Sequence, residues 1–374
     1  MGSVNNTSIR AGAAIDIGTT TVQAQLLNLD TGETLETLAA LSDQRIFGAD
    51  VMTRIHVTQN GKTKELFSAI NNQIENMLLH FLKKHNLTAI TQCAVSGNTT
   101  MLHLFCNIDP ASMGTAPYVP IFLEEKQFSG KDLFLSADHI TLLPGISAFV
   151  GADITAGLAY VDILKEKENT LFIDIGTNGE MAVWKADEKR LLCCSTAAGP
   201  CFEESEISCG LNASDFIKTI AEMKRAGVID ETGALEDDFR ETGFTVKEGC
   251  IITQKDIRQF QLAKSAIYSG IRTICKTAKL KLENIKNVYI AGGLGYHLNL
   301  ESAAEVRLIP KEFVNNQGSV KTNVCGNTSL LGAVKSLTDQ TFLPLCREIV
   351  SNAEVTDLTN DRYFSAAFAA NMTI

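Results

Sequence analysis

The sequence predicts an α/β protein with two lobes that repeat one architecture on either side of a cleft. Three observations support this fold class. The chain has 374 residues, which suits two domains better than one core. A short apolar run followed by Asp-Ile-Gly and hydroxyl or amide side chains occurs at Asp16 and again at Asp174. These aspartates are 174 − 16 = 158 positions apart, about one domain length, and a third strand-to-glycine turn follows near Gly292.

Each copy of the repeated pattern predicts a buried strand that ends in a phosphate-binding turn. A short apolar run bounded by turn residues indicates such a strand, and glycine directly after it allows a sharp turn. Amides freed by the turn, with hydroxyl groups beside them, bind phosphate oxygens. One copy would be a weak indication, because most strand-Gly-Thr turns are plain turns. Two copies predict hairpins that face each other across a cleft, with six phosphate contacts: Gly18, Thr19, Thr20, Gly176, Thr177 and Asn178.

The first lobe is expected at residues 11–167. Alternating apolar positions predict three strands within residues 13–41. Apolar residues spaced by three and four predict a helix over 63–85. Residues 94–105 indicate strand, turn and helix, whereas the prolines and short apolar pieces of 110–147 predict an irregular excursion, a lid or an interface arm.

The second lobe is expected at residues 168–374, because the charged stretch just before it is typical of a boundary. It begins as the first lobe does, with strand, turn and hairpin, which indicates an internal duplication. Thr253 and Asp256 form a capping-box pattern that opens a long helix. The apolar tail of residues 357–374 is expected to pack back onto this lobe.

Composition excludes several classes of function. A net charge of −10 and a pI near 5.2 argue against nucleic-acid binding and against anionic membranes, since both would repel the chain. The most apolar window, residues 142–164, contains Pro144, Gly145 and two aspartates, which does not suit a membrane span. Ten cysteines without a Cys-x-x-Cys pair favour free thiols in a reducing compartment, so we expect a cytoplasmic protein.

The histidines and cysteines do not form a metal-binding pattern in the sequence. No His-x-His or His-Glu-x-x-His occurs, which argues against zinc, and His103 on an apolar helix face is typical of a core histidine. Neighbouring cysteines on a strand point to opposite faces, so a cluster or redox role for Cys193, Cys194, Cys201 and Cys209 is the weaker interpretation.

Two phosphate turns followed by a glycine turn resemble the superfamily of sugar kinases, actin and heat-shock ATPases (ASKHA), whose lobes are RNase H-like. The resemblance implies that the first two turns hold the phosphates of ATP and the third the adenosine. The adenosine contacts would then come from the third turn: Gly292, Gly293 and Gly295. Asp16 and Asp174 would hold Mg²⁺, mainly through water. A helix between the phosphate turns carries a polar residue that orients the attacking water in this superfamily; Asp153 either has that role or is only a helix N-cap.

A narrower resemblance rests on motifs that occur in a specific order along nearly the whole chain. They are Ile15-Asp16-Ile17-Gly18-Thr19-Thr20-Thr21, Phe47-Gly48-Ala49-Asp50-Val51, Gly97-Asn98-Thr99-Thr100-Met101-Leu102-His103, Ala116-Pro117-Tyr118-Val119-Pro120, Ser195-Thr196-Ala197-Ala198-Gly199-Pro200, Ile207-Ser208-Cys209-Gly210 and Thr253-Gln254-Lys255-Asp256-Ile257-Arg258. Together they resemble the C-terminal ATPase part of reductive activators of corrinoid proteins. The resemblance implies that ATP drives electron transfer to an inactive cob(II)amide in a partner, giving the cob(I)amide that methyl transfer needs. It also implies a homodimer that docks the corrinoid protein.

Two departures from that family matter. Its members usually carry an N-terminal ferredoxin-like domain with four cysteine ligands, and the residues before Ala13 could not hold one. We therefore expect no iron–sulfur cluster in this chain: either the chain is an excised domain, or the electron comes from a separate iron–sulfur or flavin protein. A Cys-Gly-Ser-Gly turn usual in the family is also missing after Gly210, which leaves nucleotide affinity open.

Two other functions stay open. A small-molecule kinase would share the fold, with Gly97, Asn98, Thr99 and Thr100 lining an acceptor pocket. A docking module that does not hydrolyse ATP would keep the surface and lose the chemistry, and the shortened segment after Gly210 favours it. The corrinoid partner and the electron donor are not identified by the sequence.

Overall fold

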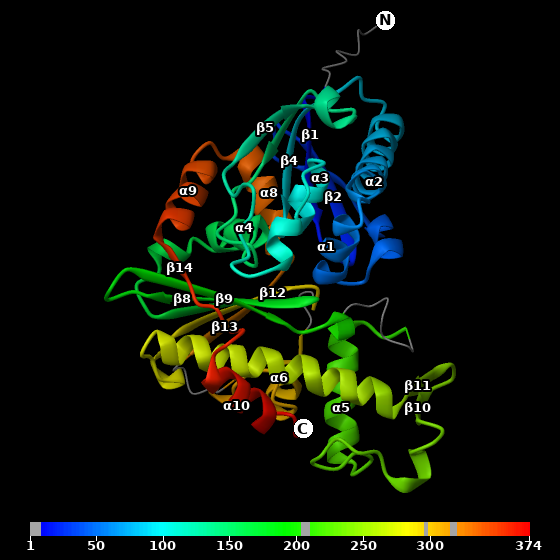
Figure 1. The fold of residues 1–374 in the computed structure, drawn as a ribbon, viewed down its shortest axis with the longest axis vertical. Helices are drawn as coiled ribbons and strands as arrows, with labels where there is room; N and C mark the ends of the chain where they lie inside the picture. The colour runs from blue at the N-terminus through cyan, green and yellow to red at the C-terminus, as the bar shows by residue number, and fades with distance from the viewer. Residues whose placement is uncertain (1–8, 203–209, 295–297, 315–319) are drawn as a thin grey trace, which may run out of the picture. The chain divides into compact units, whose positions relative to one another are not determined.

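The structure is a computed structural model that describes residues 9–202, 210–294, 298–314 and 320–374. The chain divides into two compact units, one of Met1–Tyr160 with Ser329–Ser351 and one of Val161–Thr328 with Asn352–Ile374. Each unit contains a six-stranded sheet with helices packed on it (Figure 1). The predicted α/β fold with two lobes is therefore confirmed. Within the described residues, no helix is both long and apolar enough to cross a membrane.

The sheet of the first unit has the strand order β3-β2-β1-β4-β6-β5. Strand β1 is antiparallel to β2 and parallel to β4, so the ends of β1 and β4 lie side by side. Strand β1 is buried at nearly every position, as its apolar sequence predicts. The strands are β1 (Ala11–Ile17), β2 (Thr21–Asn28), β3 (Thr34–Leu41), β4 (Ile90–Gly97), β5 (Lys126–Ser129) and β6 (His139–Leu142).

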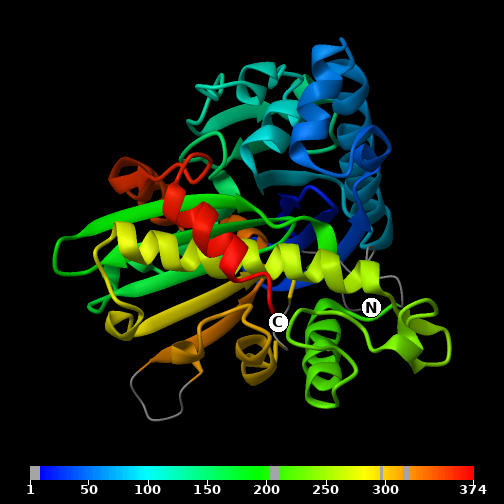
Figure 2. The same cartoon turned by 60° about the horizontal axis from the view of Figure 1, so that its bottom comes forward.

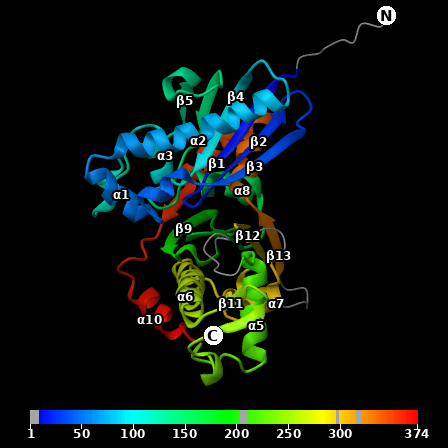
Figure 3. The ribbon, with the colours of Figure 1, turned by 90° about the vertical axis from the view of Figure 1, so that its right-hand side faces the viewer.

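Helices cover both faces of this sheet. Helices α2 and α3 lie on one face, and α4 and α8 on the other (Figure 3). Helix α2 turns one row of apolar side chains to the sheet, with Ile70, Ile74 and Phe81 fully buried. The helices of this unit are α1 (Val51–Gln59), α2 (Thr63–Lys84), α3 (Thr99–Phe105), α4 (Ala152–Tyr160), α8 (Thr328–Thr338) and α9 (Phe342–Asn352), of which α9 ends one residue beyond the unit.

The segment 110–147 is more regular than its sequence suggests. It contributes strands β5 and β6, and β6 pairs with β4 in parallel. The expectation of an irregular excursion was therefore wrong for residues 126–142. Each of these strands has four residues, which is too short for alternation of apolar and polar positions to reveal them.

The sheet of the second unit repeats the order of the first. Its order is β13-β12-β7-β8-β9-β14, so β7 lies between an antiparallel β8 and a parallel β12, as β1 lies between β2 and β4. The predicted duplication is confirmed at this level. The strands are β7 (Thr170–Ile175), β8 (Asn178–Lys185), β9 (Arg190–Ala197), β12 (Asn287–Gly292), β13 (Lys321–Gly326) and β14 (Ala353–Val355), and a separate hairpin is formed by β10 (Phe244–Lys247) and β11 (Cys250–Ile252).

Helix α6 (Gln254–Thr277) is the longest element of the second unit and packs across β8 and β9 (Figure 1). It begins with the predicted capping box, in which Thr253 and Asp256 each accept the other's backbone N–H. Helix α10 (Arg362–Ala370) lies along it (Figure 2), so the tail packs back as predicted. The unit also contains α5 (Ala213–Arg225) and α7 (Leu300–Glu305).

The C-terminal segment is held on α6 by polar side chains that are themselves buried. The Nζ of Lys264 donates to the carbonyl oxygens of Asn371, at 2.6 Å, and Thr373. Ser265 donates to the carbonyl of Phe368 at 2.5 Å. Burial, and then the positive charges of Arg307 and Lys224, lower the pKa of the fully buried Lys264 to about 7. The carbonyl bonds are therefore what makes this ammonium tolerable in the core.

The two units do not follow the sequence order that we expected. Residues 329–351, placed in the second lobe by the sequence, pack with the first unit. Helix α8 approaches α4 so closely that a Cβ added to Gly332 would lie 2.6 Å from the carbonyl oxygen of Ala156. Two helices meet without intervening side chains there, a contact that no local pattern reveals.

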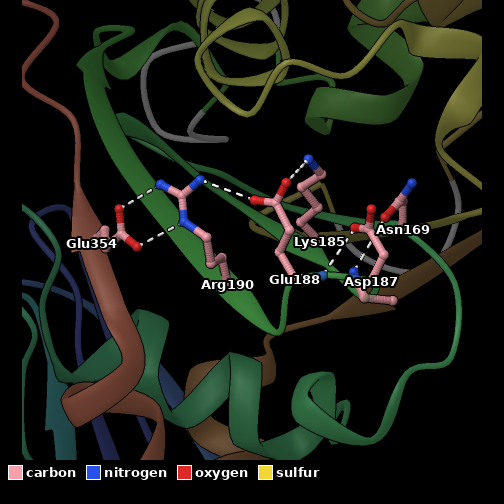
Figure 4. Close-up of polar contacts among 7 residues, drawn as sticks. Asn169, Lys185, Asp187, Glu188, Arg190 and Glu354 are labelled. Carbon is pink, nitrogen blue, oxygen red and sulfur yellow. Dashed lines mark hydrogen bonds and ion pairs between the residues drawn. The ribbon is translucent and has the colours of Figure 1, made fainter.

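An ion-pair network ties the edge strand β14 to the hairpin of β8 and β9 (Figure 4). Arg190 donates to both carboxylate oxygens of Glu354, at 2.9 and 2.7 Å, and to Glu188 at 3.1 Å. Lys185 pairs with the other oxygen of Glu188. The pair of Arg190 with Glu354 is largely exposed, so it contributes little to stability, but it joins the neighbouring strands β9 and β14 in their observed register.

His103 is a core histidine, as predicted, and it anchors the segment before β5. Its Nδ1 lies 2.7 Å from the carbonyl oxygen of Thr99, so Nδ1 carries the proton. Its Nε2 accepts the backbone N–H groups of Ile121, at 3.0 Å, and Phe122, at 3.4 Å. The ring also stacks on Phe122. Burial lowers the pKa of His103, because the charged imidazolium loses its contact with water. A proton on Nε2 would also oppose two N–H donors.

We predict that His103→Gln flattens the pH dependence of stability in mildly acidic solution. The folded-state pKa lies below the unfolded value, so the unfolded chain takes up a proton first as pH falls through about 6.5. The free energy of unfolding should then fall by up to about 1.4 kcal/mol per pH unit in the wild type, and less in the variant. Urea unfolding at a series of pH values measures this slope. The exposed His139→Gln is the control, and equal slopes in wild type and His103→Gln would contradict the assignment.

Candidate nucleotide-binding turns

The first predicted phosphate turn joins β1 to β2 in the first unit. The N–H of Gly18 donates to the carbonyl of Thr21 at 3.0 Å, which closes the turn. A Cβ added to Gly18 would lie 2.5 Å from that carbonyl oxygen, so only glycine fits. Thr19 and Thr20 are buried on the turn, and Asp16 is half-buried at the end of β1. The structure therefore brings all four predicted residues of this turn together.

A buried arginine that the sequence did not single out supports this turn. Arg54 on α1 is fully buried, and its guanidinium donates to the carbonyl of Thr19 and to that of Gly48. It also bonds to the side-chain oxygen of Gln44 and the sulfur of Met101. All four acceptors are neutral, and burial lowers the pKa of Arg54 to about 10. A buried cation thus lies behind the turn, and its charge favours the binding of an anion there.

A second support comes from the start of α3. The side-chain oxygen of Asn98 accepts the N–H of Met101 and caps the helix. Its amide nitrogen donates to the hydroxyl of Thr19 at 3.0 Å. This bond occupies one lone pair of the hydroxyl, so the Thr19 proton is left to donate elsewhere.

Asp153 lies beside Asp16 in the first unit. It is in the first turn of α4, where its Oδ1 accepts the N–H of Ile154 at 2.9 Å. Burial, and then the charge of Asp16, raise the pKa of Asp153 to about 7. Two carboxyl groups near one phosphate turn suit the binding of a hydrated cation and the orientation of a water.

The second predicted phosphate turn joins β7 to β8 in the second unit and is one residue shorter than the first. The N–H of Gly176 donates to the carbonyl of Asn178 at 3.0 Å, and the carbonyl of Thr177 accepts the N–H of Gly199 at 2.8 Å. Asp174 is half-buried two residues before the glycine, as Asp16 is before Gly18. The predicted residues of this turn are therefore also brought together, within their own unit.

The third glycine turn follows β12 and touches the second phosphate turn. Gly292 has φ +102°, and a Cβ there would lie 2.3 Å from the carbonyl oxygen of Ile175 and 2.6 Å from Oδ1 of Asp174. Gly293 is exposed and donates its N–H to Ile175. The hydroxyl of Ser214 bonds the carbonyl of Leu294 at 2.7 Å. The remaining predicted residue of this turn, Gly295, lies outside the described residues.

Gly97 is the counterpart of Gly292 in the first unit, and the sequence did not suggest its role. It ends β4 beside Ile17, and a Cβ on it would lie 2.8 Å from the carbonyl oxygen of Ile17. In both units a glycine on the neighbouring parallel strand packs against the carbonyl just before the phosphate turn. The signal was present, since Gly97 follows an apolar strand as the other glycines do. Arg54 had no such signal.

The carboxylates suit a magnesium ion that is held partly by water and nucleotide better than a metal ion that is held wholly by protein side chains. Among the described residues, no group of three or more His, Cys, Asp or Glu side chains is placed to hold a metal. Mg²⁺ is typically bound through one or two carboxylates, several waters and the phosphates of a nucleotide. Asp16, at the end of β1 with the phosphate turn two residues away, offers such a partial ligand set.

We predict that Gly292→Ala destabilises the second unit, whereas Gly293→Ala does not. The first methyl group would collide with backbone and with Asp174 at a positive φ, at a cost of roughly 1–3 kcal/mol. The second would meet no atom within 4 Å. Thermal unfolding of the two variants without nucleotide measures the difference. Equal melting temperatures would show that β12 does not press on the second phosphate turn.

Comparison with known proteins agrees with this geometry. The family model of the RACo middle region matches residues 11–166. The model of the C-terminal domain of RACo, the ASKHA domain, matches residues 168–217 and 213–374. The solved structure of a reductive activator for corrinoid, iron–sulfur protein superposes with a TM-score of 0.91 at 31% identity, covering 99% of this chain and 67% of that one.

Two curated proteins are similar over most of this chain. The corrinoid activation enzyme RamQ of Eubacterium limosum is 28% identical, with 96% of this chain and 70% of RamQ covered. The [Co(II) methylated amine-specific corrinoid protein] reductase of Methanosarcina barkeri is 27% identical over 85% of this chain and 68% of that protein. The predicted ASKHA fold and the predicted family are thus confirmed: the chain belongs to the RACo family, and comprises its middle region and its C-terminal ASKHA domain.

Proposed function

We propose that this chain binds Mg·ATP and couples its hydrolysis to the reductive activation of a corrinoid protein from cob(II)amide to cob(I)amide. The observation that carries the proposal is the pair of equivalent phosphate turns, each with an aspartate two residues before its glycine, in a chain of the RACo family. These relatives are named as activators or reductases of corrinoid proteins. The proposal includes a homodimer and an iron–sulfur or flavin electron donor in another domain or protein.

The residues of the turns have distinct proposed roles. Backbone amides and hydroxyl groups at Gly18, Thr19, Thr20, Gly176, Thr177 and Asn178 bind phosphate oxygens, and Gly292, Gly293 and Gly295 leave room for the adenosine. Asp16 and Asp174 hold Mg²⁺, mainly through water, and Asp153 orients the attacking water. When bound, Mg²⁺ neutralises charge on the phosphate oxygens. Phosphoryl transfer to water depends on such positioning and charge neutralisation more than on covalent chemistry, so this short set of residues suffices.

ATP can drive activation through a difference in affinity between conformers. If one conformer binds ATP and the corrinoid partner more tightly, hydrolysis changes which conformer is favoured, and with it the docking of the partner. The electron has to come from elsewhere, because thiol couples transfer two electrons and the cobalt step takes one. Described cysteines such as Cys193, Cys194 and Cys275 are also buried, and burial raises their thiol pKa, so they are poor thiolates.

We predict that Asp174→Asn lowers ATP turnover about 100-fold while leaving nucleotide affinity within about threefold of wild type. The carboxylate is proposed to act on magnesium and water rather than on the nucleotide itself. Calorimetry with ATP and Mg²⁺ gives the affinity, and phosphate release gives the turnover. Asp187→Asn, an exposed aspartate of the same unit, is the matched control. Equal losses of affinity and turnover would make Asp174 structural, and no nucleotide binding at millimolar concentration by the wild type would remove the ATPase proposal.

We also predict that the chain binds a corrinoid protein but does not reduce it without an added donor. Anaerobic mixing of chain, ATP and a cob(II)amide-loaded corrinoid protein should leave the visible spectrum unchanged. Addition of a reduced iron–sulfur or flavin protein should then produce the cob(I)amide band, and omission of ATP should prevent it. A cob(I)amide band without a donor would contradict the proposed division of labour. Failure to form any complex in gel filtration would remove the corrinoid partner itself.

A further inference from the structure

The carboxylate of Asp16 is held by a hydroxyl group that lies far from it in the sequence. Ser329, in the first turn of α8, places its Oγ 2.7 Å from Oδ1 of Asp16. The same Oγ lies 2.9 Å from the Oγ of Ser96, which is the neighbour of Asp16 on the parallel strand β4. Ser329 and Ser96 are buried, with exposed fractions of 4% and 0%, so water does not compete for these bonds.

The directions of the two hydrogen bonds follow from the chemistry of the groups. A carboxylate only accepts, so the single proton of Ser329 goes to Asp16. Ser96 must then donate its own proton to the Oγ of Ser329. The result is a directed chain from Ser96 through Ser329 to Asp16, in which each bond polarises and strengthens the next.

The duplicated architecture shows that this chain of hydrogen bonds is specific to the first unit. Ala291 occupies, beside Asp174, the place that Ser96 occupies beside Asp16, and it has no hydroxyl to donate. Ser329 is itself the counterpart of Asp153: each is the second residue of the helix that follows β13 or β6. The second residues of the two helices, Ser329 and Asp153, thus both lie near the carboxylate of Asp16.

We infer that Ser329 is a positioning residue for Asp16, supported by Ser96. It fixes Oδ1 of the carboxylate, so that the group offers the nucleotide-bound Mg²⁺ one defined orientation instead of several rotamers. Loss of a hydrogen bond of this kind to a metal-binding group commonly lowers the affinity for the metal 10- to 100-fold. The inference rests on the proposed Mg·ATP function and extends it to residues that contact neither nucleotide nor metal.

The test is the magnesium dependence of nucleotide affinity, which does not require turnover. Binding of a non-hydrolysable ATP analogue is titrated by calorimetry in EDTA and in a series of Mg²⁺ concentrations. Ser329→Ala should lower the apparent affinity for Mg²⁺ about tenfold and leave affinity in EDTA unchanged. Ser336→Ala is the matched control, because Ser336 lies on the same helix and bonds only the carbonyl of Ala333 within it, at 2.7 Å.

Ser96→Ala provides a second variant in case Ser329→Ala does not fold. It removes the outer donor and keeps the bond to Asp16, so we expect a smaller loss of Mg²⁺ affinity, about threefold. A normal Mg²⁺ dependence in either folded variant, even with a lower melting temperature, would overturn the inference and leave Ser329 as a contact that only docks α8. A wild type whose nucleotide binding ignores Mg²⁺ would instead contradict the proposed function, and the inference with it.

Discussion

One steric constraint shapes both units: the chain must reverse directly after an aspartate-bearing strand without a side chain at the reversal. In the first unit the reversal is closed by the bond from Gly18 to the carbonyl of Thr21, which leaves no room for a Cβ. The strand beside it must then end in a glycine as well, because Gly97 packs against the carbonyl of Ile17.

The two units share this geometry but surround it with different chemistry. In the first unit a buried cation, Arg54, and an amide, Asn98, both bond to Thr19, and Asp16 lies near a second carboxyl group, Asp153. In the second unit the turn is braced by backbone contacts from Gly199 and by the close approach of β12. Duplication of a backbone thus left each copy free to acquire its own polar neighbours.

The sequence predicted well the features that depend on residues close together in the chain. The two strand-to-glycine turns, the capping box at Thr253 and the packing of the tail each depend on a local pattern that the structure bears out. The features that it missed depend on contacts between distant residues. Ser329 and Asp16 are 313 positions apart, and Arg54 is 35 from Thr19, so no spacing rule connects them. The placement of residues 329–351 with the first unit belongs to the same class, since it rests on contacts with residues far away in the sequence, such as that of Gly332 with Ala156.

The buried ammonium of Lys264 makes the last residues of the described chain part of the core of the second unit. Its carbonyl partners, Asn371 and Thr373, lie in a C-terminal segment of the kind that protein engineers commonly remove. Ile374 is also buried, and its N–H donates to the carbonyl of Glu231 at 3.0 Å. Removal of this segment would leave the ammonium of Lys264 without its carbonyl partners in an apolar interior. A fusion partner or surface tether is therefore better attached at an exposed loop such as the tip of the β8–β9 hairpin.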